Sequence, residues 1–507
     1  MAVANEAGIE SQRAPFMVPC FVGGAWQETA RTEERQGPYH HYAVSIASQA
    51  DTALVDVAVA AAVSGRAAVA TMSPSDRADV LERAAELTDQ RSDEIAERLA
   101  LELGKPVRDG RGEALRVAAT FRIAAAETRR LGGSVLPAEG WPLGRGSTVL
   151  TRSTPVGVVL AITPFNAPAN LLAHKLAASF AAGNSTIIKS PPQAPASTAI
   201  VVEIALEAGV PAEAIQLLHG GADIGAQLCA APGIGAVAFT GSAGAGAAVA
   251  RAAGPKRTVL ELGGNAATIV HEDADIPKAA AACARTGYSN SGQSCISVQR
   301  VYVHRSRLEE FVAAFTGHVN NLVVGDPLDP ATDVGSMVDE AAASRVAAWV
   351  EEAAAEGGTV PTGGVRTHAT VTPAVVLEPP STSKVVREEI FGPAVVVLGY
   401  DDIDQVIDEC NASRYGLQAG LFTHDVGTIF DLWRRLEVGA LVVNGPSNHR
   451  LDHIPFGGVK DSGIGRESPA FMIEDFMTTS TLHLRGISLW GESEISSTPN
   501  RTERETP

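Results

Sequence analysis

Residues 156–189 read VGVVLAITPFNAPANLLAHKLAASFAAGNSTIIK, and this stretch decides the fold class. Two short runs rich in β-branched residues, Val156–Ile162 and Thr186–Lys189, flank an alanine-rich segment of helical character. A strand, a helix and a second strand in succession are typical of a parallel sheet covered by helices. The stretch therefore predicts an α/β fold.

The same alternation continues on both sides of this stretch. A helical segment that ends at Ala208 is followed by Gly209, and another that ends at Leu103 is followed by Gly104. A glycine directly after the last helical residue is a common helix C-terminus. The remaining runs that predict strands are Ala236–Phe239, Thr258–Leu262, Val395–Leu398, Ala419–Phe422 and Ala440–Val443. A chain of 507 residues is long enough for roughly three folding units.

The charge and composition exclude several classes of function. A net charge of −18 gives no broad basic field, which argues against nucleic acid or an anionic membrane as a partner. No apolar run approaches the roughly 20 residues that cross a bilayer, and Met1–Arg13 lacks a secretory signal pattern. The five cysteines are too scattered for a disulfide framework or a metal site. We therefore expect a cytoplasmic protein without a bound metal.

The first candidate for chemistry is Cys295, which ends the sequence Asn-Ser-Gly-Gln-Ser-Cys from residue 290. It precedes a run with β character, Ile296–Val303. A single cysteine in such a turn is by itself more typical of a structural thiol. Glu261 ends an apolar run and is followed by two glycines. Apolar surroundings disfavour the ionised carboxylate and suit a general base, whereas the alternative is a solvated glutamate at a strand end.

Three further motifs follow predicted strands. Asn166 has an amide suited to a developing oxyanion, although asparagine after a strand is often a turn residue. Lys189 ends an apolar strand where doubly wound folds bind ligands, and the alternative is a surface lysine. Phe239-Thr-Gly-Ser242 precedes a helix whose N-terminus suits a phosphate, but it lacks the full dinucleotide fingerprint.

Taken together and in order, these motifs resemble those of the aldehyde dehydrogenase superfamily, from about Phe21 to about Leu484. The spacing also agrees, since Cys295 follows Glu261 by 34 residues, 295 minus 261. Within the superfamily the chain is most similar to the branch that oxidises lactaldehyde, phosphonoaldehydes and phosphorylated glyceraldehyde. The motifs are Thr163-Pro-Phe-Asn166, Ile188-Lys189, Phe239-Thr-Gly-Ser242, Glu261-Leu-Gly-Gly264, Gly292-Gln-Ser-Cys295, Glu388-Glu-Ile-Phe-Gly-Pro393 and Pro455-Phe-Gly-Gly-Val-Lys460.

The resemblance implies a mechanism. Cys295 would attack the aldehyde carbonyl to form a thiohemiacetal and then a thioester. Asn166 and the backbone N–H of Cys295 would stabilise the oxyanion. Glu261 would activate the water that hydrolyses the thioester. Because Glu261 is present, oxidation with water is expected rather than the coenzyme A-dependent variant.

The resemblance also implies NAD or NADP as cofactor. In strictly NAD-preferring relatives, a glutamate three residues after the lysine binds the adenine ribose. Pro192 stands there in this chain, so no carboxylate repels the 2′-phosphate of NADP and both cofactors stay open. The residues that match cofactor positions are Thr163, Pro164, Phe165, Lys189, Pro192, Thr240, Gly241, Ser242, Leu262, Glu389 and Phe391.

The positions that match the substrate channel contain arginines. Arginine pairs with carboxylate, phosphate or phosphonate oxygens, which favours a short anionic aldehyde. Phosphonoacetaldehyde or phosphonoformaldehyde is the first expectation, with lactaldehyde and succinate semialdehyde open. The alternative is that the arginines form ion pairs within the protein, for instance Arg450 with Asp452. The expected substrate-binding residues are Arg116, His174, Ser294, Arg450 and His453.

The architecture implied by the resemblance has three parts. Residues 1–137 and 158–264 would form a Rossmann-like dinucleotide-binding domain, and residues 265–465 an α/β catalytic domain. Residues 138–157 and 466–490 would form a β flap for oligomerisation, in which Pro142–Thr154 reads as an exposed hairpin. The edge strand Thr481–Leu484 would pair in a neighbouring subunit of a homodimer or homotetramer. Residues 491–507 are polar without periodicity and predict a disordered tail.

Two other classes of function remain open. The same fold can serve as a catalytically silent binding protein, although Cys295, Glu261 and Asn166 are all retained. A thiol esterase that never uses its dinucleotide is the other alternative.

Overall fold

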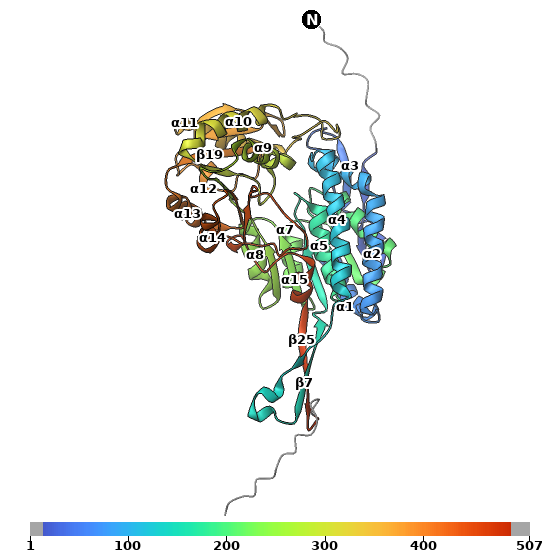
Figure 1. The fold of residues 1–507 in the computed structure, drawn as a ribbon. Helices are drawn as coiled ribbons and strands as arrows, with labels where there is room; N and C mark the ends of the chain where they lie inside the picture. Colours follow the sequence, from blue (N-terminus) through green and yellow to red (C-terminus); the bar gives the residue numbers. More distant parts are fainter. Residues whose placement is uncertain (1–13, 488–507) are drawn as a thin grey trace, which may run out of the picture.

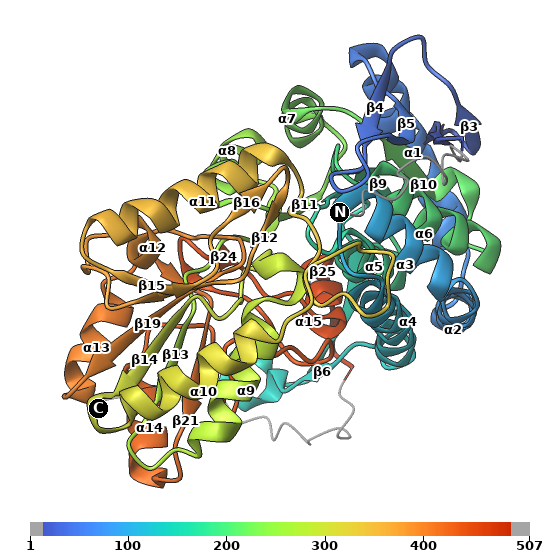
Figure 2. The same cartoon turned by 90° about the horizontal axis from the view of Figure 1, so that it is seen from above.

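Two large sheets and one narrow projecting sheet organise the chain in the computed structural model, which describes residues 14–487 (Figure 1). The predicted tail at residues 491–507 lies outside the described residues. Figure 2 shows the two large sheets side by side, each with helices on both faces.

The first large sheet has eight strands in the order β24-β12-β11-β8-β9-β10-β2-β3. Its five central strands run parallel, whereas β24 and β2 pair antiparallel with β12 and β10. The strands are β24 (Gly463–Ile464), β12 (Arg257–Glu261), β11 (Ala236–Thr240), β8 (Val158–Ile162), β9 (Ser185–Lys189), β10 (Ile215–Leu218), β2 (Cys20–Val22) and β3 (Ala25–Gln27).

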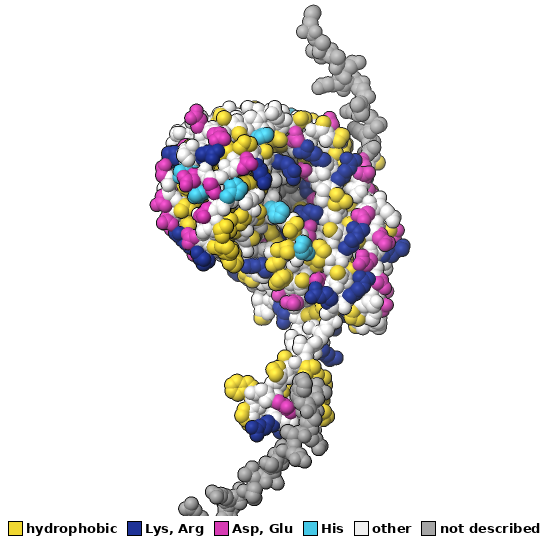
Figure 3. Space-filling model, viewed as in Figure 1, with side chains coloured by type: hydrophobic (Ala, Val, Ile, Leu, Met, Phe, Trp, Pro, Cys, Tyr) yellow, Lys and Arg dark blue, Asp and Glu magenta, His cyan; other side chains and the backbone are white. Residues whose placement is uncertain are grey.

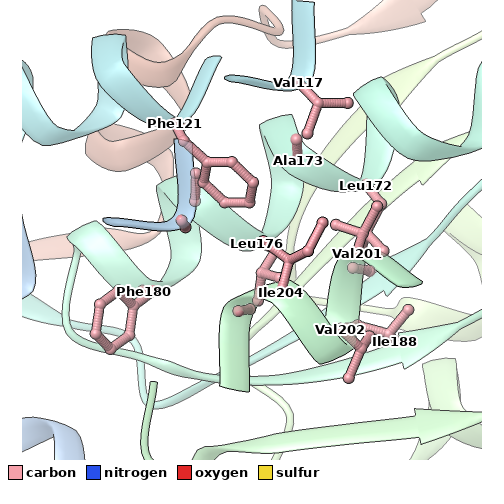
Figure 4. Close-up of a cluster of buried hydrophobic side chains, with 14 of the residues drawn as sticks. Val117, Phe121, Leu172, Ala173, Leu176, Phe180, Ile188, Val201, Val202 and Ile204 are labelled. Atoms are coloured by element: carbon pink, nitrogen blue, oxygen red, sulfur yellow. The ribbon is translucent and has the colours of Figure 1, made fainter. Parts of the chain in front are cut away.

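Alternating side chains of these strands bury both faces of the sheet. Val159 and Ala161 of β8 pack into one core with Ile188, whereas Val158 and Leu160 pack into the core on the opposite face. Such alternation follows from the two-residue repeat of a strand. Figure 4 shows side chains from α4, α5, α6 and β9 meeting in the first core. The helices on that face are α2 (Pro74–Gln90), α3 (Ser92–Leu103), α4 (Val107–Thr128), α5 (Pro168–Ala181) and α6 (Pro195–Ala208), and those opposite are α1 (Thr52–Ala70), α7 (Ala222–Ala230) and α8 (Ala243–Ala253).

The second large sheet has seven strands in the order β15-β18-β19-β14-β13-β21-β22, parallel except for β15. The strands are β15 (Thr359–Thr362), β18 (Ala374–Leu377), β19 (Ala394–Tyr400), β14 (Arg300–His304), β13 (Ala267–Val270), β21 (Gln418–Phe422) and β22 (Ala440–Val443). Helices α9 (Ile276–Gly287) and α10 (Leu308–Asn320) cover one face. The other helices of this half are α11 (Glu340–Ala355), α12 (Lys384–Arg387), α13 (Ile403–Asn411) and α14 (Val426–Arg435).

The projecting sheet has the order β25-β7-β6, with β25 (Met477–Arg485), β7 (Ser147–Pro155) and β6 (Val135–Leu136). β25 pairs antiparallel with β7 over its whole length and is an edge strand (Figure 1). The expected hairpin at Pro142–Thr154 is wrong in its first part, because Pro142–Gly144 forms a short 3-10 turn. Helix α15 (Pro469–Asp475) leads into β25 and packs against α5.

Three short sheets complete the described chain. The first has the order β1-β5-β4, and the other two are the pairs β16-β17 and β20-β23. Their strands are β1 (Phe16–Val18), β5 (Ala43–Ser48), β4 (Thr32–Gln36), β16 (Arg366–Thr367), β17 (Thr370–Val371), β20 (Tyr415–Gly416) and β23 (Val459–Lys460).

Two other sequence expectations need correction. The run Ile296–Val303 becomes a strand only from Arg300, because Ser297 closes a turn onto Ser294 and the Gln299 side chain bonds to Asn265. The second is the expectation that no apolar run approaches 20 residues. Helix α1 has 19 residues and is long and apolar enough to cross a membrane by length and composition. In this fold Val55, Ala58, Ala62 and Val69 of α1 pack into the protein core.

Gly104 ends α3 with a left-handed backbone, φ +71°, and an added Cβ there would lie 1.9 Å from Ser336 Oγ. We expect Gly104→Ala to lower the free energy of unfolding by about 1–3 kcal/mol, from backbone strain and this clash. Gly112→Ala is the matched control, because Gly112 lies inside α4 with open space around it and alanine favours the helix. Calorimetric unfolding should show a lower melting temperature for the first variant and an unchanged or higher one for the second. Equal melting temperatures would contradict the assignment.

Candidate active site

A cavity of about 940 Å³ lies where the two large sheets approach each other. Figure 3 shows a hollow between the two halves of the molecule with Lys, Arg and His side chains around it. Among the residues that the sequence singled out, the cavity is lined by Thr163, Pro164, Phe165, Asn166, Lys189, Pro192, Thr240, Gly241, Ser242, Glu261, Leu262, Cys295, Glu389, Phe391 and Arg450.

Strand ends supply one wall of this cavity. Ile162 of β8 pairs with Lys189 of β9, and Thr240 of β11 pairs with Glu261 of β12. Parallel strands place their carboxyl ends at one edge of a sheet, which is where ligands bind in open α/β folds. Lys189, Thr240 and Glu261 therefore face the same space although they are far apart in sequence.

Cys295 follows a tight turn. Asn290 and Ser291 have positive φ values of 50° and 54°, an uncommon conformation for residues with side chains. The Asn290 backbone N–H donates to Asp109, and its side-chain amide donates to the carbonyl of Asn166. Burial, with a smaller contribution from Glu389 and against the effect of Arg450, raises the pKa of Cys295 to about 12. The half-buried sulfur is therefore a thiol at neutral pH.

Glu261 lies 3% exposed at the end of β12. Neither of its carboxylate oxygens has a hydrogen-bond partner among the described residues. Burial raises the pKa of Glu261 well above its usual range, and Glu467 raises it further. A carboxyl group with a raised pKa and free oxygens is suited to exchanging a proton with a bound water.

A buried ion-pair network lies beside Glu261. Lys175 of α5 donates to Glu467 Oε1 at 2.6 Å and to the Thr240 hydroxyl at 2.7 Å. Arg450 donates to the other oxygen of Glu467 at 2.9 Å. Burial alone would raise the pKa of Glu467, but Lys175 and Arg450 lower it to about 2. Glu467 is therefore ionised and holds both cations in place.

The two candidate substrate arginines have carboxylate partners in the protein. Asp452 accepts from Arg116 Nε at 3.0 Å and from Nη2 at 2.6 Å. Arg450 Nε lies 3.5 Å from Asp452 Oδ1, and the fully buried His174 has Nε2 3.0 Å from the same oxygen. The ion pairs that the sequence left as the alternative are thus present, with Glu467 as the nearer partner of Arg450.

The remaining expected substrate residues lie apart from the cavity lining. Arg116 and His174 contact Asp452, which in turn contacts Arg450, and neither of them lines the cavity. His453 is exposed directly after Asp452. Ser294 is half-buried next to Cys295, and its hydroxyl accepts from the backbone N–H of Ile296 at 3.4 Å. A role for these four residues in substrate binding stays a prediction.

Asn166 is held through its backbone carbonyl. Lys105 Nζ donates to this carbonyl at 2.7 Å, and the Asn290 side chain donates at 3.0 Å. Lys105 also pairs with the buried Glu113, which accepts the N–H groups of Ala169 and Asn170 at the start of α5. The Asn166 amide is therefore presented to the cavity from a fixed backbone.

The strand-end wall suits a dinucleotide. Lys189 is 7% exposed, and its Nζ donates to no acceptor among the described residues. Burial lowers the pKa of Lys189 to about 8. An unpartnered buried ammonium group that lines a cavity fits the phosphate or ribose oxygens of a nucleotide. Ser242 caps α8 beside it, and Pro192 brings no carboxylate to this wall.

On the other wall Glu389 accepts from the backbone N–H of Gly264 at 2.9 Å. Burial raises the pKa of Glu389 to about 7. Gly263 lies so close that an added Cβ would be 2.4 Å from Glu389 Oε2. A carboxylate fixed in this way can accept hydrogen bonds from ribose hydroxyls.

The sequence did not single out Lys175, Glu467, Lys105 or Glu113. Lys175 stood out only as a charged residue within an apolar helix, NLLAHKLAASF from residue 170. Glu467 lies 292 residues further along the chain, so no local pattern pairs the two.

Comparisons with known proteins agree with this geometry. The sequence profile described as "Aldehyde dehydrogenase family" matches residues 26–482. The chain is 43% identical to the 3-sulfolactaldehyde dehydrogenase of Priestia aryabhattai, over 90% of this chain and 95% of that protein.

Solved structures are similar as well. Aldehyde dehydrogenase 21 from Physcomitrella patens, in complex with the reaction product succinate, has a TM-score of 0.91 and 33% identity, covering 94% of this chain and 100% of that one. The NADP-dependent glyceraldehyde-3-phosphate dehydrogenase from Bacillus halodurans, complexed with NADP, has a TM-score of 0.90 and 31% identity, covering 93% and 99%.

Proposed function

This chain belongs to the aldehyde dehydrogenase family, and on that premise we propose that it oxidises a short aldehyde bearing an anionic group to the carboxylate. The predicted family and α/β fold class are confirmed, as is the NAD(P)-dependent oxidation of an aldehyde. The substrate, the roles of individual residues and the assembly are proposals.

The observation that carries the proposal is Arg450, a cation on the cavity wall that also contains Cys295. A sulfonate is the first choice of anion, because the relative from Priestia aryabhattai is a sulfolactaldehyde dehydrogenase. The phosphonoaldehydes expected from the sequence stay a prediction. Succinate semialdehyde is a further candidate, since the similar plant enzyme was solved with succinate.

The chemistry follows from the placement of three side chains. Cys295 loses its proton and its sulfur adds to the aldehyde carbon, while the Asn166 amide and the Cys295 N–H donate to the resulting oxyanion. Loss of hydride from the thiohemiacetal leaves a thioester on Cys295. Glu261 then takes a proton from water, whose oxygen attacks the thioester carbon and displaces the sulfur as a thiolate. The carboxylate leaves, and the proton held by Glu261 passes to the sulfur and restores the thiol.

The dinucleotide would be held on the strand-end wall by Lys189, Ser242 and Thr240, and on the opposite wall by Glu389 and Phe391. When bound, NAD or NADP supplies the hydride acceptor. Pro192 leaves NADP use open, so both forms belong in every assay.

We also propose that the sheet β25-β7-β6 is a flap for assembly into a homodimer or homotetramer. Edge strands with unpaired backbone groups favour pairing with another chain, and β25 is such a strand. Two large apolar side chains, Trp141 and Leu143, are exposed near the flap tip. The division into residues 1–137 with 158–264, 265–465, and 138–157 with 466–490 stays a prediction, as does a cytoplasmic location.

Initial rates of reduced cofactor with sulfolactaldehyde, phosphonoacetaldehyde, lactaldehyde, succinate semialdehyde and hexanal test the substrate class. We expect kcat/KM to favour the anionic aldehydes over hexanal, and Arg116→Met to lower kcat/KM for them by about 30-fold or more with little change for hexanal. Arg122→Met is the matched control, because Arg122 lies on the same helix but pairs with the exposed Asp89. Preference for hexanal or lactaldehyde, or equal losses in both variants, would overturn the proposed class.

A further inference from the structure

Asp452 lies at the centre of a charged cluster next to the cavity, which consists of Arg116, His174, Lys175, Arg450, Asp452 and Glu467. Its two oxygens accept from Nε and Nη2 of Arg116, and Oδ1 is also 3.0 Å from His174 Nε2. Arg450 Nε approaches the same oxygen at 3.5 Å. One carboxylate therefore faces two arginines, while Glu467 pairs with Arg450 and Lys175 on the far side.

The ionisation of each group follows from its neighbours. Burial alone would raise the pKa of Asp452, but hydrogen bonds from His174 and Arg116 hold it well below its usual range. Burial and Arg450 lower the pKa of His174, so this imidazole is neutral. Glu467 is ionised, because Lys175 and Arg450 lower its pKa to about 2. The ion-paired groups of the cluster are thus three cations, Arg116, Lys175 and Arg450, and two carboxylates, Asp452 and Glu467, which leaves one positive charge among them.

The guanidinium groups of Arg116 and Arg450 also have hydrogen-bond donors that the described part of the protein does not use. Within residues 14–487, Nη1 of Arg116 and Nη1 of Arg450 donate to no acceptor. Arg450 is 9% exposed, lines the cavity and stacks over the Phe456 ring at 4.2 Å, while Arg116 is 38% exposed. An anion in the cavity near Arg450 would therefore meet free guanidinium donors and a net charge of one.

We propose that Asp452 is a specificity-determining residue, which restricts the site to aldehydes whose anionic group carries one charge, a sulfonate or a carboxylate, and excludes the dianionic forms of phosphonates and phosphates. The inference rests on the proposed function and names the charge of its substrate. A second negative charge would face Asp452 and Glu467 without a cation to match it, and like charges in an enclosed site repel each other.

Sulfoacetaldehyde and phosphonoacetaldehyde form a matched pair for the first test, because they differ only in the head group. A sulfonate keeps one charge at every working pH, whereas a phosphonate, like a phosphate monoester with its second pKa of about 6, gains a second charge near neutrality. We expect the ratio of kcat/KM for phosphonoacetaldehyde to that for sulfoacetaldehyde to fall by about tenfold per pH unit above that pKa. The ratio cancels the titration of groups that affect both substrates equally, such as the nucleophile Cys295.

Asp452→Asn tests the residue itself. The variant keeps the shape of the side chain and removes its negative charge. The second charge of a dianionic substrate could then pair with the arginines that Asp452 otherwise neutralises. At pH 8 the phosphonate-to-sulfonate ratio should rise by about tenfold or more, mainly through KM, and its fall with pH should flatten. Asp89→Asn is the matched control, because Asp89 also pairs with an arginine of α4 but on the surface. Its ratio should equal that of the unmodified protein.

The outcomes separate two kinds of failure. A ratio independent of pH in the unmodified protein, or an unchanged ratio in Asp452→Asn, would overturn the role of Asp452 while leaving oxidation of anionic aldehydes intact. The pH series needs no variant, so it decides the question even where Asp452→Asn fails to fold. tert-Butylacetaldehyde, a neutral molecule of the same shape, tests the underlying proposal. Turnover of this compound equal to that of sulfoacetaldehyde would overturn the proposed function itself.

Discussion

Replacing Cys295 by alanine is expected to lower kcat for every aldehyde by about 10⁴-fold or more, because the covalent route requires the sulfur and no other group in the cavity wall can replace it. The other described cysteines, Cys20, Cys229, Cys283 and Cys410, are buried in the protein core. Formation of reduced cofactor under saturating aldehyde measures the loss.

Cys410→Ala is the matched control for that experiment, since Cys410 lies on the buried face of α13 and does not line the cavity. It should keep kcat within a few-fold of the unmodified protein. Binding of NAD and NADP by Cys295→Ala, measured by calorimetry, should also be preserved. Residual turnover in Cys295→Ala close to the normal rate would contradict the assignment of the nucleophile.

Replacing Glu261 by glutamine should lower steady-state turnover by about 10²–10⁴-fold, because the base that activates water is removed. The first turnover should survive, since acylation of Cys295 precedes the attack of water. Rapid mixing should therefore show a burst of reduced cofactor that approaches one equivalent per site, followed by a slow phase. Glu272→Gln is the matched control, an exposed carboxylate shortly after β13.

The pH dependence provides a second test of Glu261. Its folded-state pKa is raised, so the carboxyl group is protonated at low pH and becomes a base only as the pH rises through that value. Deacylation should accelerate with rising pH in the unmodified protein and should lose most of this dependence in Glu261→Gln. A slow first turnover in the variant would place Glu261 in the acylation step and contradict its role as the hydrolytic base.

Local patterns account for the parts of the fold that the sequence predicted. The predicted runs match four strands to within about one residue, namely β9, β11, β12 and β21. These strands are buried on both faces, and their apolar side chains give a recognisable sequence pattern. The ends of α3 and α6 fall before Gly104 and Gly209, as helix-ending glycines indicate. The hairpin at Pro142–Thr154 was missed in part, since the partners of β7 are β6 and the distant β25.

Some residues of the candidate site could likewise be predicted from the sequence, and others could not. Residues at strand ends, such as Lys189, Thr240 and Glu261, could be predicted because the parallel fold brings strand ends together. The charged cluster could not, because Asp452 and Arg116 are 336 residues apart and their pairing depends on tertiary packing. Two arginines in the sequence suggested an anionic aldehyde, and the structure pairs both of them with carboxylates of the protein.

The most direct test of the account is the intact mass of Glu261→Gln after mixing with NADP or NAD and sulfoacetaldehyde. We expect one added sulfoacetyl group per chain, located on Cys295 by peptide mapping and absent when the cofactor is omitted, because thioester formation needs the hydride acceptor. Reduced cofactor without any adduct, or an adduct on a residue other than Cys295, would contradict the covalent mechanism.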